Sequence, residues 1–216
     1  MTKTPELIRI TPSTAGATRL TLARVPRRNA VNKQLADEVS AAVAMLGEEG
    51  VRVAILDAEG PAFCAGADLD DLVAGGAAVE QIVETLSGTP IHWTAVVNGA
   101  VRGAGLSILA ACSRVIVTPD STFGLPEISR GFFPADLIGE LASIVGARRA
   151  FNLAFRGAPI SAETALSMGL VSDVVGVDEL ESFVESSSAD LLAVEPSALR
   201  HGVELWQSHA RSAATL

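Results

Sequence analysis

The sequence is poor in the residues that build metal sites and disulfide frameworks. It has two cysteines, three histidines, no tyrosine and only 4% aromatic residues. Cys64 and Cys112 give neither a disulfide framework nor the paired spacing of a zinc site. The histidines, at positions 92, 201 and 209, form no His-x-x-x-His motif. We therefore expect no bound metal.

Basic residues and long apolar runs are also scarce. Lysine and arginine total 16 against 25 aspartates and glutamates, which gives a formal charge of −9. This charge argues against nucleic-acid binding, which needs a basic surface, although a few arginines can still hold a small anion. No apolar run approaches the roughly 20 residues of a membrane span, and the first ten residues contain no apolar signal segment. The expected location is cytoplasmic, without a membrane partner.

The remaining composition is that of a folded protein of about one domain, because 49% of its 216 residues are hydrophobic. Apolar periodicity predicts strands that alternate with helices, which indicates an α/β fold with parallel strand pairing. The predicted strands are 18–24, 51–58, 91–101, 114–124 and 170–176, and the predicted helices are 33–50, 68–87, 103–112, 134–155, 161–169 and 196–210. A single boundary, within "ESSSADLLAVEPS", divides a core of residues 1–188 from a C-terminal helical appendage of residues 189–216.

Two turns from strand to helix consist largely of small residues. They are "FCAGADL" (63–69) and "VNGAVRGAG" (97–105). Free N–H groups at the start of a helix attract anions, and small side chains let a ligand approach them. Close packing of a strand on its helix is the commoner reason for one such turn. The second turn lacks the dinucleotide fingerprint, since Ile108 stands where its last glycine belongs. Two such turns whose amides point at one thioester oxygen would stabilise an enolate.

Five segments, in the correct order and spacing, resemble the enoyl-CoA hydratase/isomerase (crotonase) superfamily. They are "PRRNAVN", "AFCAGADL", "VNGAVRGAG", "AACSRVIVTPDSTFGLPEISRG" and "ISAETALSMGLVSDVV". The resemblance extends from residue 6 to about residue 180. It implies a crotonase-like spiral of β-β-α turns, acyl-CoA substrates without a further cofactor, and a trimer or a dimer of trimers. The C-terminal helical segment is shorter than in most members, which leaves the oligomer geometry and the acyl pocket open.

The resemblance also assigns residues to the thioester and to coenzyme A. The backbone N–H groups of Ala67 and Ala104 would form the oxyanion hole, with Ala104 in place of the usual glycine. Arg27 and Arg28 would lie near the CoA phosphates or pantetheine. The backbone of Ala65, Asp68 and Leu69 would surround the adenine and pantetheine. A solvated turn explains the two arginines equally well, and the acid of residue 68 fits the first turn of a helix.

The number of acids at the site favours one reaction. Family hydratases use two glutamates, and this sequence has Ser107 at the first position and Glu127 at the second. Serine does not ionise near neutral pH, so it is a poor general base. One base suffices to isomerise a 3-enoyl-CoA, and we therefore prefer an isomerase that uses Glu127. The alternatives are a hydratase with water held by Ser107, another acyl-CoA lyase or hydrolase, and a non-catalytic acyl-CoA-binding or partner subunit.

Asp136 and Cys64 are weaker candidates. Asp136 follows Glu127 near the start of a helix, where dienoyl-CoA isomerases of this family carry a functional aspartate. The offset is one residue longer here, and an acid in the first turn of a helix is the alternative. Cys64 has no neighbouring histidine to activate it, so we expect it to pack in the core.

Overall fold

The computed structural model describes residues 6–74 and 76–213, apart from the side chains of Leu72, Asp136 and residues 209–213. Its main sheet has six strands in the order β1-β2-β3-β5-β7-β10. β1 and β2 are antiparallel, and every other pair in this sheet is parallel. These strands are β1 (Ile8–Pro12), β2 (Thr18–Leu22), β3 (Val53–Ala58), β5 (His92–Val97), β7 (Arg114–Val117) and β10 (Asp173–Val174).

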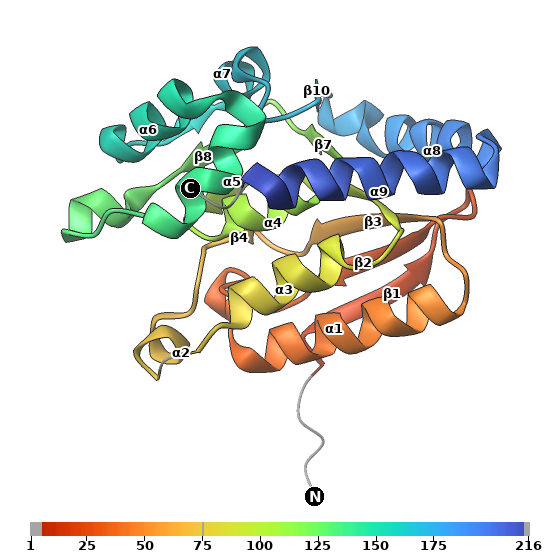
Figure 1. The fold of residues 1–216 in the computed structure, drawn as a ribbon, viewed down its shortest axis with the longest axis horizontal. Helices are drawn as coiled ribbons and strands as arrows, with labels where there is room; N and C mark the ends of the chain where they lie inside the picture. The colour runs from red at the N-terminus through yellow and green to blue at the C-terminus, as the bar shows by residue number, and fades with distance from the viewer. Residues whose placement is uncertain (1–5, 75, 214–216) are drawn as a thin grey trace, which may run out of the picture.

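A second sheet has four short strands in the order β4-β6-β8-β9. They are β4 (Ala62–Cys64), β6 (Ala100–Arg102), β8 (Thr122–Gly124) and β9 (Ile160–Ser161). The first three each follow a main-sheet strand directly and pair in parallel, so the chain repeats a β-β-α turn three times. The predicted α/β class and the crotonase-like spiral are confirmed (Figure 1).

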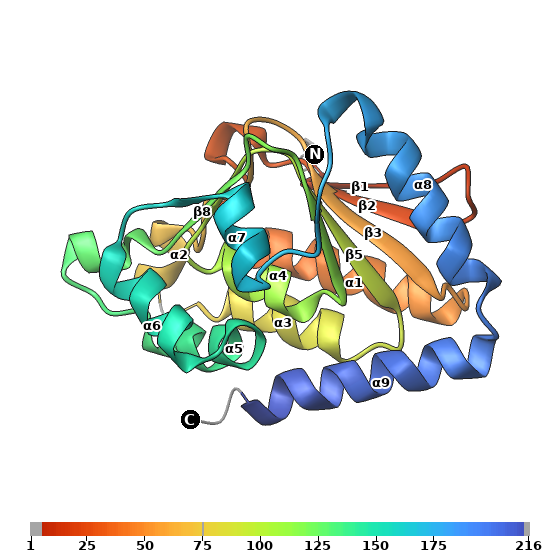
Figure 2. The same cartoon turned by 90° about the horizontal axis from the view of Figure 1, so that it is seen from above.

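Helices cover both faces of the main sheet (Figure 2). α1, α3 and α4 pack on one face, α8 packs on the other, and α9 lies beside α4, α5 and the end of α3. Alternate residues of β3 serve the two faces, as the strand period of two requires. The α-helices are α1 (Lys33–Glu48), α2 (Leu69–Val73), α3 (Ala78–Ser87), α4 (Gly105–Ala111), α5 (Ala135–Val145), α6 (Ala147–Arg156), α7 (Ala162–Met168), α8 (Val177–Ala193) and α9 (Pro196–Ala213); η1 (Val25–Arg27) and η2 (Pro126–Arg130) are 3-10 helices.

The helix ends follow from local sequence. Asn32 begins α1, since its side chain accepts the Leu35 N–H at 3.1 Å. Ser161 begins α7 in the same way by accepting the Thr164 N–H at 3.3 Å. The expected helix 68–87 is two helices, α2 and α3, with Gly76 between them, and Gly75 lies outside the described residues. The expected helix 134–155 is also two helices, α5 and α6, with Gly146 between them.

Several elements differ from those expected, and among them β1 and β9 were not predicted. The predicted strands 91–101 and 114–124 are each two strands, because the chain changes sheets between them. The first change occurs at Gly99, with φ of +121°, where a Cβ would overlap the Pro61 carbonyl. α8 was not predicted, because its serine-rich sequence was interpreted as a domain boundary. The division at residue 188 stays a prediction.

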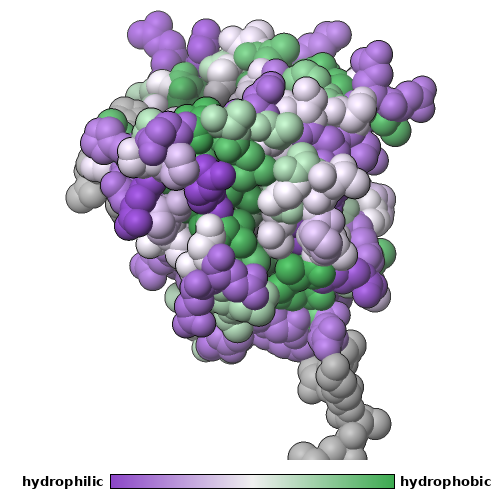
Figure 3. Space-filling view, turned by 90° about the vertical axis from the view of Figure 1, so that its right-hand side faces the viewer, coloured by the Kyte–Doolittle hydropathy of each residue, from purple (hydrophilic) through white to green (hydrophobic). Residues whose placement is uncertain are grey.

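The end of the molecule where α8 and α9 meet shows an apolar stripe between polar side chains (Figure 3). A groove of about 310 Å³ lies against α9, lined by residues that include His92, Leu199 and Trp206. His92 begins β5, whereas the turn with small residues follows its other end, so His92 is remote from that turn. In the part of the chain that the structure describes, no helix is both long enough and apolar enough to span a bilayer.

Candidate active site

The two turns of small residues are packed against each other. β4 and β6 pair in parallel, so their carboxyl ends lie at the same edge of the second sheet. A Cβ on Gly66 would lie 3.1 Å from the Arg102 carbonyl oxygen and 3.6 Å from the Ala104 nitrogen. A Cβ on Gly105 would lie 3.0 Å from the Cβ of Cys64. Glycine at these positions therefore lets one backbone lie directly on the other.

The Ala67 amide faces away from the strand-like segment that holds it. Val31 and Ala67 form a parallel bridge, in which the Val31 N–H donates to Gly66 O at 2.8 Å and the Asp68 N–H donates to Val31 O at 2.7 Å. In such a bridge the N–H of the central residue points to the opposite side. Among residues 6–74 and 76–213, the Ala67 N–H has no acceptor.

The Ala104 amide is the corresponding group of the second turn. Ala104 precedes α4 with φ of −57° and ψ of −13°, values that an alanine adopts without strain. The first N–H groups of a helix have no partner within the helix. The Ala104 N–H donates to no acceptor in the described chain. Two unbonded amides thus lie on two touching turns, as an oxyanion hole requires.

Glu127 lies beside the second turn. It belongs to η2, which follows β8, and a Cβ on Gly103 would overlap its Oε1 atom. Its Oε2 atom is buried and has no hydrogen-bond partner in the described part of the protein. Burial raises the pKa of the Glu127 carboxyl, although its own backbone and the positive charge of Arg130 partly oppose this shift. A carboxyl group of this kind is suited to accept and return a proton.

Ser107 and Asp136 contribute less to this geometry. Ser107 lies on α4 and is 5% exposed, and its hydroxyl has no hydrogen-bond partner within the described residues. It provides a polar atom near the second turn but no ionisable group. The Asp136 side chain lies outside the described residues, so its predicted role stays a prediction.

The Asp68 carboxylate is held by arginines. Its Oδ2 accepts from Arg24 at 2.5 Å, and its Oδ1 accepts from Arg27 at 3.3 Å and from the Asp70 N–H at 3.0 Å. Burial acts to raise the pKa of Asp68, but hydrogen bonds from Arg24, the Asp70 amide and Arg27 lower it overall. Asp68 therefore fixes the start of α2 on η1 and remains ionised.

The two predicted CoA arginines differ in their freedom. Arg27 also pairs with Asp70, at 2.7 Å, so its guanidinium is engaged. Arg28 is exposed, and its guanidinium has no partner among the residues described. The Arg28 carbonyl accepts the Ala65 N–H at 3.0 Å, which places Arg28 next to the first turn. Leu69, at the start of α2, is 57% exposed.

Comparison with known proteins identifies the family of this chain. The family model described as "Enoyl-CoA hydratase/isomerase" matches residues 13–214. The chain belongs to the enoyl-CoA hydratase/isomerase family, within the crotonase superfamily.

Similar proteins carry mostly hydratase names. The chain is 30% identical over 199 residues to "Probable enoyl-CoA hydratase echA6" of Mycobacterium tuberculosis, covering 90% of this chain and 80% of that protein. It is 32% identical over 212 residues to "Mevalonyl-coenzyme A hydratase sidH" of Aspergillus fumigatus, covering 90% and 78%. A solved enoyl-CoA hydratase of Mycobacterium smegmatis superposes with a TM-score of 0.87 at 27% identity, covering 97% of this chain and 88% of the other.

Sequence reasoning about this enoyl-CoA hydratase/isomerase family protein missed two supporting residues. Arg24 holds Asp68 and also donates to the Ala30 carbonyl at 2.7 Å. Asn29 is fully buried with φ of +54°, and its Nδ2 donates to the carbonyls of Glu59 and Ala62 at 2.9 and 2.8 Å. The asparagine in "RNAVN" could have indicated a turn with positive φ, because asparagine tolerates a left-handed backbone better than most residues.

Cys64 has the packing environment that was expected. It is fully buried beneath the first turn, and burial raises the pKa of its thiol to about 11. The thiol therefore stays protonated at neutral pH and is a poor nucleophile. Among the described residues, no group of three or more His, Cys, Asp and Glu side chains is placed to hold a metal ion.

Proposed function

We propose that this acyl-CoA enzyme is an enoyl-CoA isomerase, which moves the double bond of a 3-enoyl-CoA to C2 with Glu127 as its acid/base. The observation that carries the proposal is the half-buried Glu127 carboxyl, which has a raised pKa and an unbonded Oε2 next to the turn of Ala104. Ser107 occupies the position at which a second acid would serve hydration.

The reaction follows from these groups. The thioester oxygen accepts hydrogen bonds from the N–H groups of Ala67 and Ala104, which makes the C2 protons more acidic. The Glu127 carboxylate takes one C2 proton, and the electron pair spreads over the oxygen, C2 and C4 as a dienolate. The carboxyl then returns the proton at C4, which leaves the double bond between C2 and C3. Because burial disfavours the charged carboxylate, Glu127 is a stronger base than a free glutamate.

Coenzyme A is part of the substrate in this proposal, and no further cofactor is needed. Arg28 is the better candidate for a CoA phosphate, because Arg27 is already paired with two carboxylates. The backbone of Ala65, Asp68 and Leu69 would contact the adenine and pantetheine. Charge-assisted hydrogen bonds to phosphate are stronger than neutral ones, so Arg28→Gln should weaken CoA binding more than Arg27→Gln.

Hydration is the second candidate, because the similar proteins are mostly named hydratases. In that reaction Ser107 would hold the water, while Glu127 would have to take its proton and manage the proton at C2. One carboxyl serving both roles, with a hydroxyl that does not ionise, is less effective than a pair of acids. A role without catalysis is a further alternative, which the assay below tests. The role of Asp136 stays a prediction.

The assay supplies 3-enoyl-CoA and 2-enoyl-CoA separately and follows each product by chromatography. We expect conversion of 3-enoyl-CoA to 2-enoyl-CoA, and no 3-hydroxyacyl-CoA from either. Glu127→Gln should abolish the conversion and retain CoA binding, whereas Glu163→Gln, which changes an exposed acid of α7, should leave both unchanged. A 3-hydroxyacyl product would replace the isomerase with a hydratase. Binding of both thioesters without reaction would favour a non-catalytic subunit.

The family resemblance also predicts a trimer or a dimer of trimers and a cytoplasmic location. Light scattering on the purified protein tests the first prediction, since the masses of one, three and six chains of 22.3 kDa are well separated. Fractionation of the native cell tests the second.

A further inference from the structure

Four of the seven phenylalanines are exposed in one region of the surface. Phe132 and Phe133 lie on the connection from η2 to α5, with exposures of 70% and 37%. Phe151 and Phe155 lie on α6, with exposures of 40% and 64%. The protein has few aromatic residues, so several exposed phenylalanines in one region indicate a binding site, because contiguous apolar surface usually marks one.

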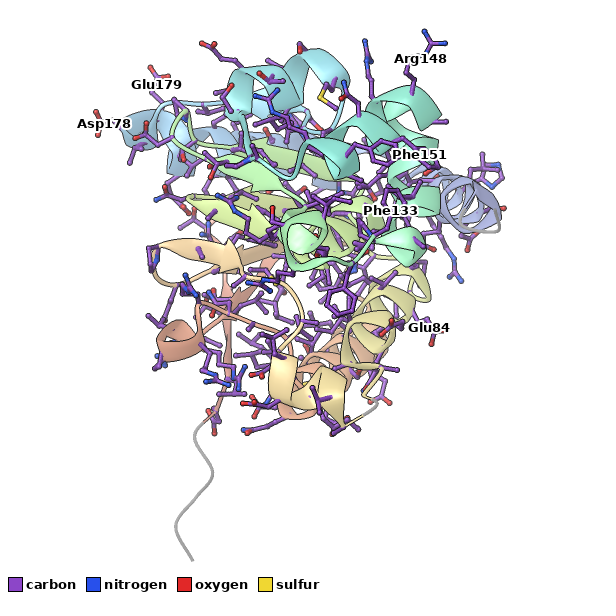
Figure 4. All side chains as sticks on the ribbon, turned by 90° about the vertical axis from the view of Figure 1, so that its left-hand side faces the viewer. Glu84, Phe133, Arg148, Phe151, Asp178 and Glu179 are labelled. Carbon is purple, nitrogen blue, oxygen red and sulfur yellow. The ribbon has the colours of Figure 1, made fainter. Side chains whose placement is uncertain are left out.

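Three of these rings form a cluster, which we call the phenylalanine cluster: Phe133, Phe151 and Phe155. The centroid distances are 5.9 Å for Phe133–Phe151, 5.2 Å for Phe133–Phe155 and 6.2 Å for Phe151–Phe155. The two α6 rings are four residues apart and therefore share a helix face. The labelled side chains of Phe133 and Phe151 lie close together between α6 and the η2–α5 connection (Figure 4).

A continuous series of contacts joins the coenzyme A side of the site to this cluster. The Arg28 carbonyl binds the Ala65 N–H, the turns of Gly66 and Ala104 touch, and Gly103 abuts the Glu127 carboxyl. The Glu127 carbonyl then accepts the Phe132 N–H at 3.1 Å, and Phe133 is the next residue. The phenylalanine cluster is therefore connected to the Glu127 backbone by one hydrogen bond and one peptide bond.

We propose that the phenylalanine cluster receives the distal hydrocarbon of the acyl group, and that the preferred substrates are acyl-CoA thioesters longer than crotonyl-CoA. This inference rests on the proposed function, since it needs a thioester held at Ala67 and Ala104. In this proposal the acyl arm, which leaves the carbonyl carbon opposite to the sulfur, extends toward the cluster. Its occupant is apolar, because the three rings offer no hydrogen bond and no charge.

The test compares kcat/KM for 3-hexenoyl-CoA and 3-dodecenoyl-CoA in the whole protein and its variants. Phe151→Ala/Phe155→Ala removes two rings and retains α6, because alanine is the best helix former. Leu205→Ala is the matched control, since Leu205 is an apolar residue of α9 with 58% exposure. We expect the wild type to prefer dodecenoyl-CoA. The double variant should lose on the order of tenfold in kcat/KM for dodecenoyl-CoA and less than about twofold for hexenoyl-CoA.

A binding measurement separates this inference from the proposed reaction. Calorimetry with saturated dodecanoyl-CoA and butyryl-CoA reports the tail contact without any turnover. If neither enoyl thioester reacts but the double variant loses dodecanoyl-CoA affinity selectively, the isomerase proposal fails and the acyl site stands. Two ratios decide the matter: kcat/KM for dodecenoyl-CoA relative to hexenoyl-CoA, and affinity for dodecanoyl-CoA relative to butyryl-CoA. If both ratios are unchanged in the double variant, the proposed acyl site is wrong. A lower mass by light scattering together with unchanged ratios would instead assign the cluster to contact between copies of this chain.

Discussion

Gly103→Ala should inactivate the protein. Its loss of stability should be little more than that of a glycine-to-alanine change at another position with positive φ. Gly103 has φ of +53°, and an alanine in this left-handed region costs about 1–2 kcal/mol. The new Cβ would overlap Oε1 of Glu127, the end of a flexible side chain, which can move at little further cost. The required shift is on the order of 1 Å, and a misplacement of that size can lower the rate about 10²-fold.

Gly169→Ala is the matched control for this experiment. Gly169 has φ of +81°, and nothing lies within 4 Å of a Cβ placed there. Both variants should lose about 1–2 kcal/mol of unfolding free energy in urea, which corresponds to a few degrees in Tm. Only Gly103→Ala should lose kcat, measured with 3-enoyl-CoA at saturation. Full activity in Gly103→Ala would refute the assigned position of the Glu127 carboxylate, and equal losses of activity in both variants would show a general structural effect.

Three further predictions concern the ionisable groups. The acidic limb of the rate profile should have its midpoint above about pH 4.3, the usual pKa of a glutamate, because burial raises the pKa of Glu127; a midpoint at or below that value would contradict the burial argument. Glu127→Gln should raise Tm at neutral pH, because a raised carboxyl pKa lowers stability as pH rises through that pKa, and the gain should vanish in acid, below the pKa of the unfolded chain. Asp68→Asn should cost about 3 kcal/mol in urea unfolding by leaving Arg24, 15% exposed, without its carboxylate, whereas Asp70→Asn at an 88% exposed side chain should cost less than about 0.5 kcal/mol. Since hydrogen bonds lower the pKa of Asp68, its contribution should be lost only as pH falls through that lowered pKa, and equal urea midpoints for the two asparagine variants would contradict the buried pair.

Elements with a strong periodic pattern could be predicted from the sequence, and the sheet switch could not. The buried face of α1, formed by Leu35, Val39, Val43 and Leu46, follows directly from its spacing. The division of 91–101 into β5 and β6 depends on the turn at Gly99, which the apolar run conceals. α8 buries only Val184 and Ser188 in its length, so its sequence has a weak helical pattern and resembles a linker.

The site was predicted in part for the same physical reason. Small residues mark a turn where backbones meet, and the resemblance to the family predicts that the amides of Ala67 and Ala104 form the oxyanion hole. That these two N–H groups have no acceptor in the described chain, and that Gly103 leaves space for Glu127, depends on contacts between distant segments. The difference between Arg27 and Arg28 likewise depends on where Asp68 and Asp70 fold. Residue spacing along a chain does not contain that information.

The bridge between Val31 and Ala67 links the amide of the first turn to the beginning of a long helix. Val31 is followed at once by Asn32, whose side chain starts α1. Fraying of that first helical turn would loosen the Ala67 peptide from behind, on the side that a substrate never touches. Changes at Asn32 would then alter turnover while leaving thioester affinity nearly intact, so the catalytic rate would depend on a helix cap that does not itself touch the substrate.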